Sequence, residues 1–209
     1  HGNNGYSGGG ISVANSGTVT VTNSIVLGNE ATTGSGGGVY MSYGTLEMEN
    51  VVISGNTSGG YYGGGLSLSY YATVILTNSA VVSNYAFYGG GVYVYWGSTM
   101  VAANSTFTHN SAYYGGGFYG YYADISFVNC NTWNNSPENF YYMADPTGYD
   151  GNISEDPLYL DMSDPDPLYW DLHLGLGSAL VDAGNGALAD PDGGASDIGS
   201  FGGPGAAFF

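Results

Sequence analysis

The chain repeats one pattern of small, apolar and polar positions five times. Each copy begins with three glycines, continues through a run in which apolar and polar residues alternate, and ends with two asparagines six residues apart. The third glycines of the triplets are Gly10, Gly38, Gly65, Gly91 and Gly117, which are 26 to 28 residues apart. A fixed period of this length indicates a solenoid in which each repeat forms one coil.

The alternation predicts three short strands in each coil. Counted from the first asparagine of a repeat, positions −4 and −2 are apolar, position +1 is mostly small and position +3 is mostly apolar. Alternation with a period of two places such residues on one face of a strand, and strands this short bury a face only when copies stack. The predicted inward residues are Val13, Val21, Met48, Leu76, Val94, Phe107, Phe127 and Cys130. Because helical spacing is absent, the sequence predicts an all-β parallel β-helix of about 26–28 residues per coil.

The recurring asparagines and the single cysteine have structural interpretations. Asparagine tolerates the left-handed backbone conformation that tight turns require, and stacked amides can hydrogen-bond along a solenoid. Cys130 occupies the small inward position and has no histidine or cation placed to form a thiolate. We therefore predict a buried, unreactive thiol.

The pattern changes after Phe140. No further glycine triplet occurs, and residues 141–167 contain four prolines. From Leu168 to Leu176 apolar and other residues alternate, which predicts a strand. We divide the chain into repeats over residues 1–140 and an irregular acidic segment over 141–209, which we expect to form the last coils and a C-terminal cap of the same solenoid.

Charge narrows the possible partners. The chain has no lysine or arginine and 17 carboxylates, of which five lie in residues 1–140 and twelve in 141–209. Binding to nucleic acid or to an anionic membrane is excluded because both require basic groups, and no stretch is long and apolar enough for direct membrane insertion. Metal ions are the natural counter-charges.

The acidic segment contains a candidate calcium site. Asp190 and Asp192 flank a proline before Gly193, Asp197 follows, and Asp182 is a weaker candidate. Carboxylates two residues apart beside a glycine turn can surround Ca²⁺, although the distal glutamate of an EF-hand is missing. The alternative is a set of solvated aspartate turns without metal.

The repeat GGGVYVYWGSTMVAANSTFTHNSAYY, residues 89–114, resembles the right-handed parallel β-helix repeats of bacterial secreted and surface proteins, including polymorphic outer-membrane-type passengers. The tail resembles their terminal segment in Asp156–Tyr159, Gly177–Gly184, Asp190–Gly193 and Asp197–Pro204. The resemblance implies a right-handed solenoid at the cell surface or outside the cell. Since the chain begins at His1, we expect that N-terminal sequence has been removed.

Aromatic residues recur at equivalent places in successive coils. Those expected to point outward from the strand after the triplet, or to lie at the corner that follows it, are Tyr40, Tyr93, Tyr119, Tyr43, Tyr70, Trp96 and Tyr122. Since neighbouring coils lie ~4.8 Å apart, like residues form ladders. Three roles are open for the ladders: they stabilise the solenoid and do nothing else, they bind a polysaccharide, or they pack against another molecule.

A glycosidase is a further alternative. Glu47 and Glu49 lie two residues apart on one strand, hence ~6.6 Å, which falls within the range of inverting enzymes. The neighbouring coils offer threonine and isoleucine rather than a cation. We therefore interpret the pair as solvated and assign no catalytic residue.

The first coil suggests self-association. Residues 3–7 already follow the repeat pattern, so Asn3, Asn4 and Tyr6 lie at an open strand edge, while Phe208 and Phe209 end the chain. Open edges that meet head to tail propagate as filaments. Three hypotheses follow: a self-associating structural solenoid, which the sequence favours, a carbohydrate-binding or adhesive module, and a polysaccharide-cleaving enzyme. A larger parent protein with earlier coils would give the same start.

Overall fold

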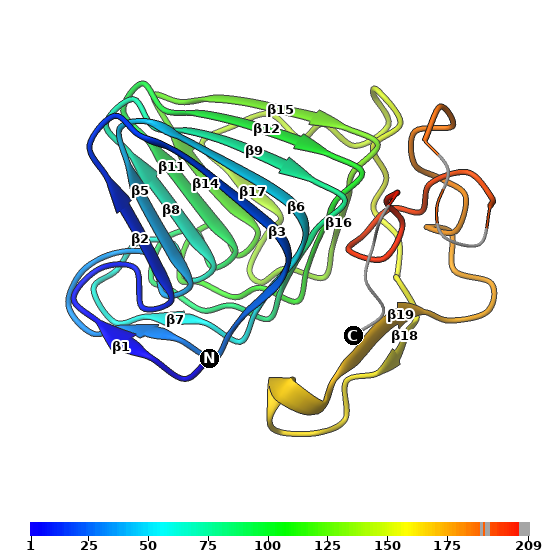
Figure 1. Cartoon of the computed structure of the whole chain (residues 1–209), viewed down its shortest axis with the longest axis horizontal. Coiled ribbons are helices and arrows are strands. Elements are labelled where there is room, and N and C mark those ends of the chain that lie inside the picture. Colours follow the sequence, from blue (N-terminus) through cyan, green and yellow to red (C-terminus); the bar gives the residue numbers. More distant parts are fainter. Residues whose placement is uncertain (189, 191–192, 205–209) are drawn as a thin grey trace.

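A computed structural model describes residues 1–188, 190 and 193–204. The chain forms a parallel β-helix of about five coils, as predicted, and the coils stack one behind another in Figure 1. Each coil has a three-sided outline around a central core, with the first coil nearest the viewer. The helical content of the described residues is one short 3₁₀ turn, η1 (Pro167–Tyr169).

Corresponding strands of successive coils pair in parallel and form three sheets. A short sheet contains β1 (Asn4–Gly5), β4 (Glu30–Ala31) and β7 (Thr57–Ser58). The second sheet contains β2 (Ile11–Ala14), β5 (Val39–Ser42), β8 (Leu66–Ser69), β11 (Val92–Tyr95), β14 (Phe118–Tyr121) and β17 (Phe140–Tyr141). The third sheet contains β3 (Thr18–Leu27), β6 (Thr45–Ser54), β9 (Thr73–Thr77), β10 (Ala80–Val82), β12 (Thr99–Ala103), β13 (Thr106–Thr108), β15 (Asp124–Val128) and β16 (Asn131–Trp133).

The glycine triplets allow the coils to approach at one corner. The first glycine of a triplet, such as Gly63, has a positive φ of 63°. A Cβ atom on the second, Gly64, would lie 2.5 Å from the carbonyl oxygen of Gly90 in the next coil. A Cβ atom on the third, Gly65, would lie 2.6 Å from the carbonyl oxygen of Gly91. A side chain is therefore strained at the first position by the positive φ, and at the second and third positions it would collide with carbonyl oxygens of the next coil.

The two asparagines of each repeat have different roles. The first ones have the predicted left-handed conformation, with φ between 46° and 53°, and bend the chain between two strands; they are Asn23, Asn50, Asn78, Asn104 and Asn129. The second ones stack inside the solenoid as a buried amide ladder: Asn29, Asn56, Asn84, Asn110 and Asn135. At each of these second asparagines, the residue with a positive φ is the one immediately before the asparagine, for example Ser83 or His109.

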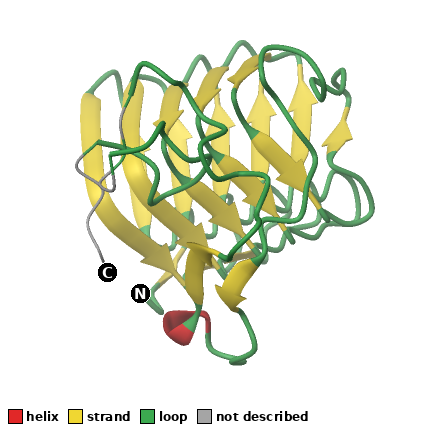
Figure 2. Cartoon of the chain, turned by 90° about the vertical axis from the view of Figure 1, so that its right-hand side faces the viewer, coloured by secondary structure: helices red, strands yellow, loops and turns green. Residues whose placement is uncertain are grey.

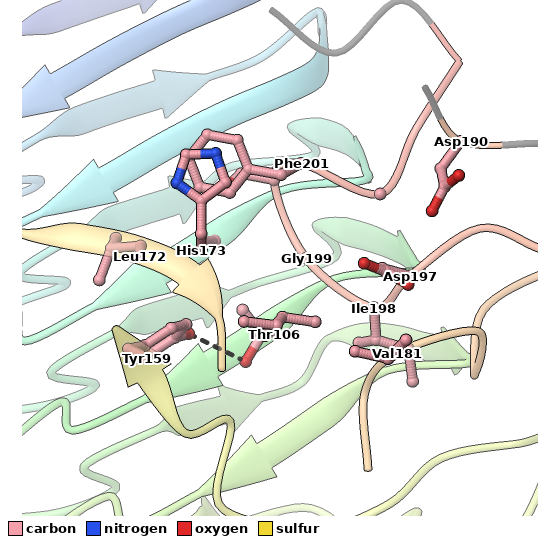
Figure 3. A pocket seen from close by; sticks show the side chains of 14 residues that line it. Thr106, Tyr159, Leu172, His173, Val181, Asp190, Asp197, Ile198, Gly199 and Phe201 are labelled. Atoms are coloured by element: carbon pink, nitrogen blue, oxygen red, sulfur yellow. Dashed lines mark hydrogen bonds between the residues drawn. The ribbon is translucent and has the colours of Figure 1, made fainter. Parts of the chain in front are cut away.

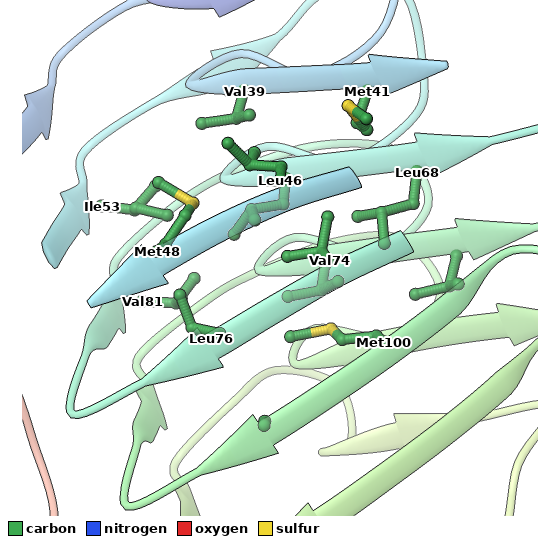
Figure 4. Close-up of a cluster of buried hydrophobic side chains, with 14 of the residues drawn as sticks. Val39, Met41, Leu46, Met48, Ile53, Leu68, Val74, Leu76, Val81 and Met100 are labelled. Atoms are coloured by element: carbon green, nitrogen blue, oxygen red, sulfur yellow. The ribbon is translucent and has the colours of Figure 1, made fainter. Parts of the chain in front are cut away.

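The core lies inside the coils and consists of the inward residues that the alternation predicts. Met48, Leu76, Val94, Phe107, Phe127 and Cys130 are buried in one continuous cluster, part of which is drawn in Figure 4. Val13 and Val21 also pack against this cluster, as predicted, but are only partly buried. Both belong to the first coil, whose strands β2 and β3 have a neighbouring coil on one side only.

The acidic segment begins as an irregular last coil and then leaves the solenoid axis. Strand β17 pairs with β14, and Ile153 bridges to Asn131, so residues up to 153 continue the stacking. The following residues run back across the outer side of the third sheet, in front of its strands in Figure 2. Leu172 packs there against Val52, Ala80 and Val82. Much of the segment thus covers a flank rather than the end of the solenoid.

A two-stranded antiparallel hairpin anchors this flank segment. It contains β18 (Tyr159–Asp161) and β19 (Asp171–Leu174). The strand expected over residues 168–176 is thus shorter, because η1 occupies Pro167–Tyr169 and Gly175 turns the chain. Further along, the backbone N–H groups of Asn185 and Gly199 donate to the side-chain and main-chain oxygens of Asn104, which hold the segment against the corner asparagines.

Candidate functional site

The outer surface of the second sheet carries the densest group of aromatic side chains in the described structure. We call this surface the tyrosine face; its members are Tyr40, Tyr43, Tyr62, Tyr70, Tyr88, Tyr93, Tyr95, Trp96, Tyr114, Tyr119, Tyr121, Tyr122, Tyr141 and Tyr142. Alternation along β11 turns Val92 and Val94 into the core and Tyr93 and Tyr95 outward. The parallel register then places Tyr93 beside Tyr119 and Tyr95 beside Tyr121.

The tyrosines form columns along the solenoid axis. Ring centroids are 5.2 Å apart between Tyr93 and Tyr119 and 5.4 Å apart between Tyr119 and Tyr141. A second column contains Tyr62, Tyr88 and Tyr114, with both centroid distances 5.5 Å. These values are close to the ~4.8 Å spacing of paired strands, so the ladder follows from the stacking of coils. Stacked and edge-on ring pairs of this kind stabilise the surface beyond the area that they bury.

The corner aromatic residues border the same face. Tyr43 and Tyr70 stack with centroids 6.0 Å apart, and Trp96 meets Tyr122 edge-on at 5.9 Å. Each of these four side chains is exposed. The structure thus brings together all seven aromatic residues that the sequence singled out. One detail differs: Tyr93 points away from the core but is only 7% exposed, because neighbouring tyrosines cover it.

Sequence reasoning missed part of this surface. It did not single out Tyr95, Tyr121, Ser35 or Ser69, although Tyr95 lies two residues after Tyr93 and therefore on the same side of the strand. A search for aromatic ladders does not select Ser35 or Ser69, because neither is aromatic. Their position in the surface becomes evident only when the tyrosines around them are known.

A recess of about 470 Å³ lies in the tyrosine face. Its lining consists of tyrosine and serine: Ser35, Tyr40, Tyr62, Ser69, Tyr70, Tyr88, Tyr93, Tyr95, Tyr119 and Tyr121. The volume is within the ~300–1,000 Å³ range of small-molecule sites. Flat apolar rings together with hydroxyl groups can contact a ligand that has both apolar faces and polar edges.

Burial raises the pKa of two phenols of this face, Tyr93 and Tyr119, above the ordinary value of ~10. It raises the pKa of Tyr119 to about 12, with smaller contributions from the surrounding phenols, and it raises the pKa of Tyr93 further. These hydroxyl groups therefore stay protonated over the physiological pH range and can both donate and accept hydrogen bonds. The site offers neutral polar groups on an apolar surface.

The paired glutamates lie on a different surface. Glu47 and Glu49 project from β6 in the third sheet, beside Thr20 and Ile75 and beside Thr22 and Thr77 respectively. Both are exposed. The structure does not bring them to the tyrosine face.

The aspartates proposed for calcium lie on the flank. The backbone N–H of Asp182 donates to an Asp197 carboxylate oxygen at 2.8 Å. Asp190 and Asp197 border a hollow of about 290 Å³ between the flank segment and the third sheet, and in Figure 3 the Asp190 carboxylate points toward Asp197. Asp192 lies outside the described residues. Within the described part of the chain, no group of three or more histidine, cysteine or acidic side chains is placed to hold a metal ion.

The same hollow contains an aromatic contact between His173 and Phe201, whose ring centroids lie 3.9 Å apart. The Nδ1 atom of His173 is 2.7 Å from a carboxylate oxygen of Asp171. Tyr159 and Thr106 interact through their hydroxyl groups at the floor (Figure 3). These contacts fix the flank segment to the solenoid.

The residues proposed for self-association are only partly within the described chain. Asn4 begins β1, and the amide of Asn3 donates to the Asn29 side chain at 3.1 Å, which extends the internal ladder to its first member. Tyr6 is strongly exposed. Phe208 and Phe209 lie outside the described residues.

Comparison with known proteins supports the fold. A family model described as right handed beta helix region matches residues 1–153. Comparisons with curated proteins and with solved structures gave no match. No helix in the described part of the chain is long and apolar enough to cross a membrane.

Proposed function

We propose, from the premise that the chain belongs to the right-handed β-helix family, that it is an extracellular solenoid that binds carbohydrate through its tyrosine face. The observation that supports this proposal is the recess of about 470 Å³ in a surface of stacked tyrosines, lined by tyrosine and serine. It favours carbohydrate binding over the other two hypotheses that the sequence raised.

The chemistry of the face suits a sugar. A pyranose has an apolar face of C–H groups and a rim of hydroxyls, so it can pack on an aromatic ring while its hydroxyls bond to phenols and serines. The rings are held in place by their neighbours in the columns, so little side-chain entropy is lost when a ligand binds. A row of such rings along the axis presents repeated contacts to a polymer.

Binding measurements on the native protein test the proposal. Soluble neutral glucan, mannan, galactan and xylan would be tested by affinity electrophoresis and calorimetry. We expect binding to at least one of them, and a loss of about tenfold or more when Tyr70 or Trp96 at the border is replaced by alanine. Tyr169→Ala is the matched control, because Tyr169 is an exposed tyrosine of η1 on the flank. Absence of binding to every polymer would show the proposal to be wrong.

Self-association is a second candidate function, favoured by the open side of the first coil. Strands β1, β2 and β3 each pair with one neighbouring strand, so one edge of each is free in the described chain. The partly buried Val13, Val19 and Val21 lie at the same end. A second copy stacked on this end would pair the edges and complete the burial of these side chains.

Sedimentation at increasing protein concentration tests this candidate. We expect assemblies that disappear in Val21→Lys, which adds a charge at the open end, and persist in Val101→Lys, whose site is exposed in a middle coil. A protein that remains monomeric at high concentration would contradict head-to-tail assembly.

A further inference from the structure

Serines interrupt the tyrosine columns in the second and third coils. In the register of the second sheet, Ser67 lies between Tyr40 on one side and Tyr93 on the other. Two residues further along these strands, Ser42 and Ser69 pair with each other, whereas the next two coils have Tyr95 and Tyr121 paired there. The columns are therefore complete in the fourth and fifth coils and lack rings in the second and third.

The missing rings create the recess. Tyr40 and Tyr93 are separated by two coil spacings, roughly 9.6 Å, because the residue between them is a serine. Tyr93 and Tyr95 form the wall where the complete columns begin, and Tyr62 and Tyr70 lie on either side. The recess corresponds to the volume of one ring missing from the column of Tyr95 and Tyr121 at the position of Ser69, and it is open to solvent.

The two serines at this interruption, Ser67 and Ser69, differ in their access to the recess. The Ser67 hydroxyl is fully buried and has no hydrogen-bond partner in the described part of the chain. Ser67 does not line the recess, so its hydroxyl gives no contact to a ligand there. Ser69, also largely buried, lines the recess itself.

Charge restricts the ligand. The lining contains only tyrosine and serine, and the whole chain carries a formal net charge of −17 without a lysine or arginine. A polyanionic glycan would be repelled by this field and would find no basic side chain to bind its carboxylates or sulfates. An uncharged sugar avoids both penalties.

We infer that the recess is a subsite for one pyranose residue of a neutral polysaccharide, and that the serine at position 69 determines its specificity by leaving out a ring of the tyrosine column. The inference rests on the proposed carbohydrate-binding function. The bound sugar ring occupies the place of the tyrosine ring that the column lacks at Ser69, with one face toward Tyr93 or Tyr95. The rest of the polymer lies along the adjoining columns.

Filling the gap tests the subsite. Ser69→Tyr extends the Tyr95 and Tyr121 column by one ring, and it is expected to fold because those two coils already hold tyrosine at this place. Ser12→Tyr is the matched control, since Ser12 pairs with Tyr40 on the same sheet but does not line the recess. Thermal melting of both variants checks that the solenoid is intact. Ser42 does not line the recess but pairs with Ser69, so Ser42→Tyr would place a ring beside Ser69 and provides a second way to narrow the recess.

The two proposals fail in different ways. We expect Ser69→Tyr or Ser42→Tyr to weaken binding of the preferred neutral polymer at least tenfold, with Ser12→Tyr unchanged. We also expect wild-type protein not to bind polygalacturonate at low or high salt. Equal binding by wild type and both gap-filled variants would overturn the subsite while leaving carbohydrate binding intact. Preferential binding of polygalacturonate would overturn the neutral-ligand inference, and absence of all binding would overturn both.

Discussion

At the scale of single residues, side-chain amides hold the coils in register. The Asn84 side chain donates to the Ile53 carbonyl and to Asn110 Oδ1, both at 2.9 Å. Its oxygen accepts from the backbone and side-chain N–H groups of Asn56. Each asparagine therefore fixes the coils on both sides, and the ladder runs through the solenoid as a polar column beside the apolar core.

Removing one amide from this ladder is expected to be costly. Asn84→Ala leaves the backbone N–H of Asn56 buried without a partner and removes the amide hydrogen bond to the Ile53 carbonyl, so we expect a loss of about 3 kcal/mol in the free energy of unfolding. Asn3→Ala at the exposed end of the ladder is the control, for which we expect less than about 1 kcal/mol. Denaturant titration measures both, and equal losses would contradict the ladder's role.

Cys130 is expected to be unreactive while the protein is folded. Burial raises the pKa of its thiol to about 12, and the Sγ atom lies 3.5 Å from the Val128 carbonyl oxygen inside the core. Since the thiolate is the reactive species, native protein should not react with a thiol-specific disulfide reagent at pH 8, whereas denatured protein should react fully. Rapid modification of native protein would show that this coil opens.

At the scale of elements, the glycine triplets set the contact between coils. Gly64→Ala would place a methyl group 2.5 Å from the backbone carbonyl oxygens of Gly90 and Tyr85. Because backbone atoms must shift, we expect a loss of ~2 kcal/mol or more. Gly186→Ala is the control, because nothing lies within 4 Å of its added Cβ. Similar melting temperatures for the two variants would contradict this steric explanation.

The regular coils could be predicted because their pattern occurs five times. Repetition separated the inward positions of Met48, Leu76 and Phe107 from the outward ones without knowledge of any contact. The flank segment could not be predicted in this way. Its path depends on individual contacts such as Leu172 on Val82 and Gly199 on Asn104, which no periodicity in the sequence signals.

The candidate site was predictable in part for the same reason. Tyr93 and Tyr119 occupy equivalent positions, so their column follows from the period of the coils. The recess is different because it arises where a ring is missing. Ser69 has meaning only once Tyr95 and Tyr121 are known to stand in the same column with the neighbouring tyrosines around them.

At the scale of the whole molecule, the acidic charge is expected to make stability depend on cations. We propose that Ca²⁺ binds the acidic segment through Asp190, Asp192 and Asp197, with Asp182 as a weaker candidate. At a free Ca²⁺ concentration ~100 times the dissociation constant, binding would add ~2.7 kcal/mol to the free energy of unfolding. Melting temperatures with calcium and with chelator measure this effect, and Asp197→Asn should reduce it. An unchanged melting temperature would indicate solvated turns without metal.

The tyrosine face is also expected to set the alkaline limit of the fold. Burial raises the pKa of Tyr119 to about 12 and that of Tyr93 further, whereas an unfolded tyrosine has a pKa of about 10. The folded state therefore binds these protons more tightly than the unfolded state. The resulting stability is complete below pH 10 and is lost as the pH rises toward 12 and beyond.

Thermal melting between pH 8 and 12 measures this loss. The variant with both Tyr93→Phe and Tyr119→Phe keeps the stacked rings but removes the two phenols, so its melting temperature should fall less steeply above pH 10 than that of wild type. Cys130, whose thiol pKa is also raised by burial, is present in both proteins and cancels from the comparison. Parallel curves for the two proteins would mean that these phenols are not the groups that limit the fold. A smaller slope in the variant would tie alkaline unfolding to two of the rings that line the recess.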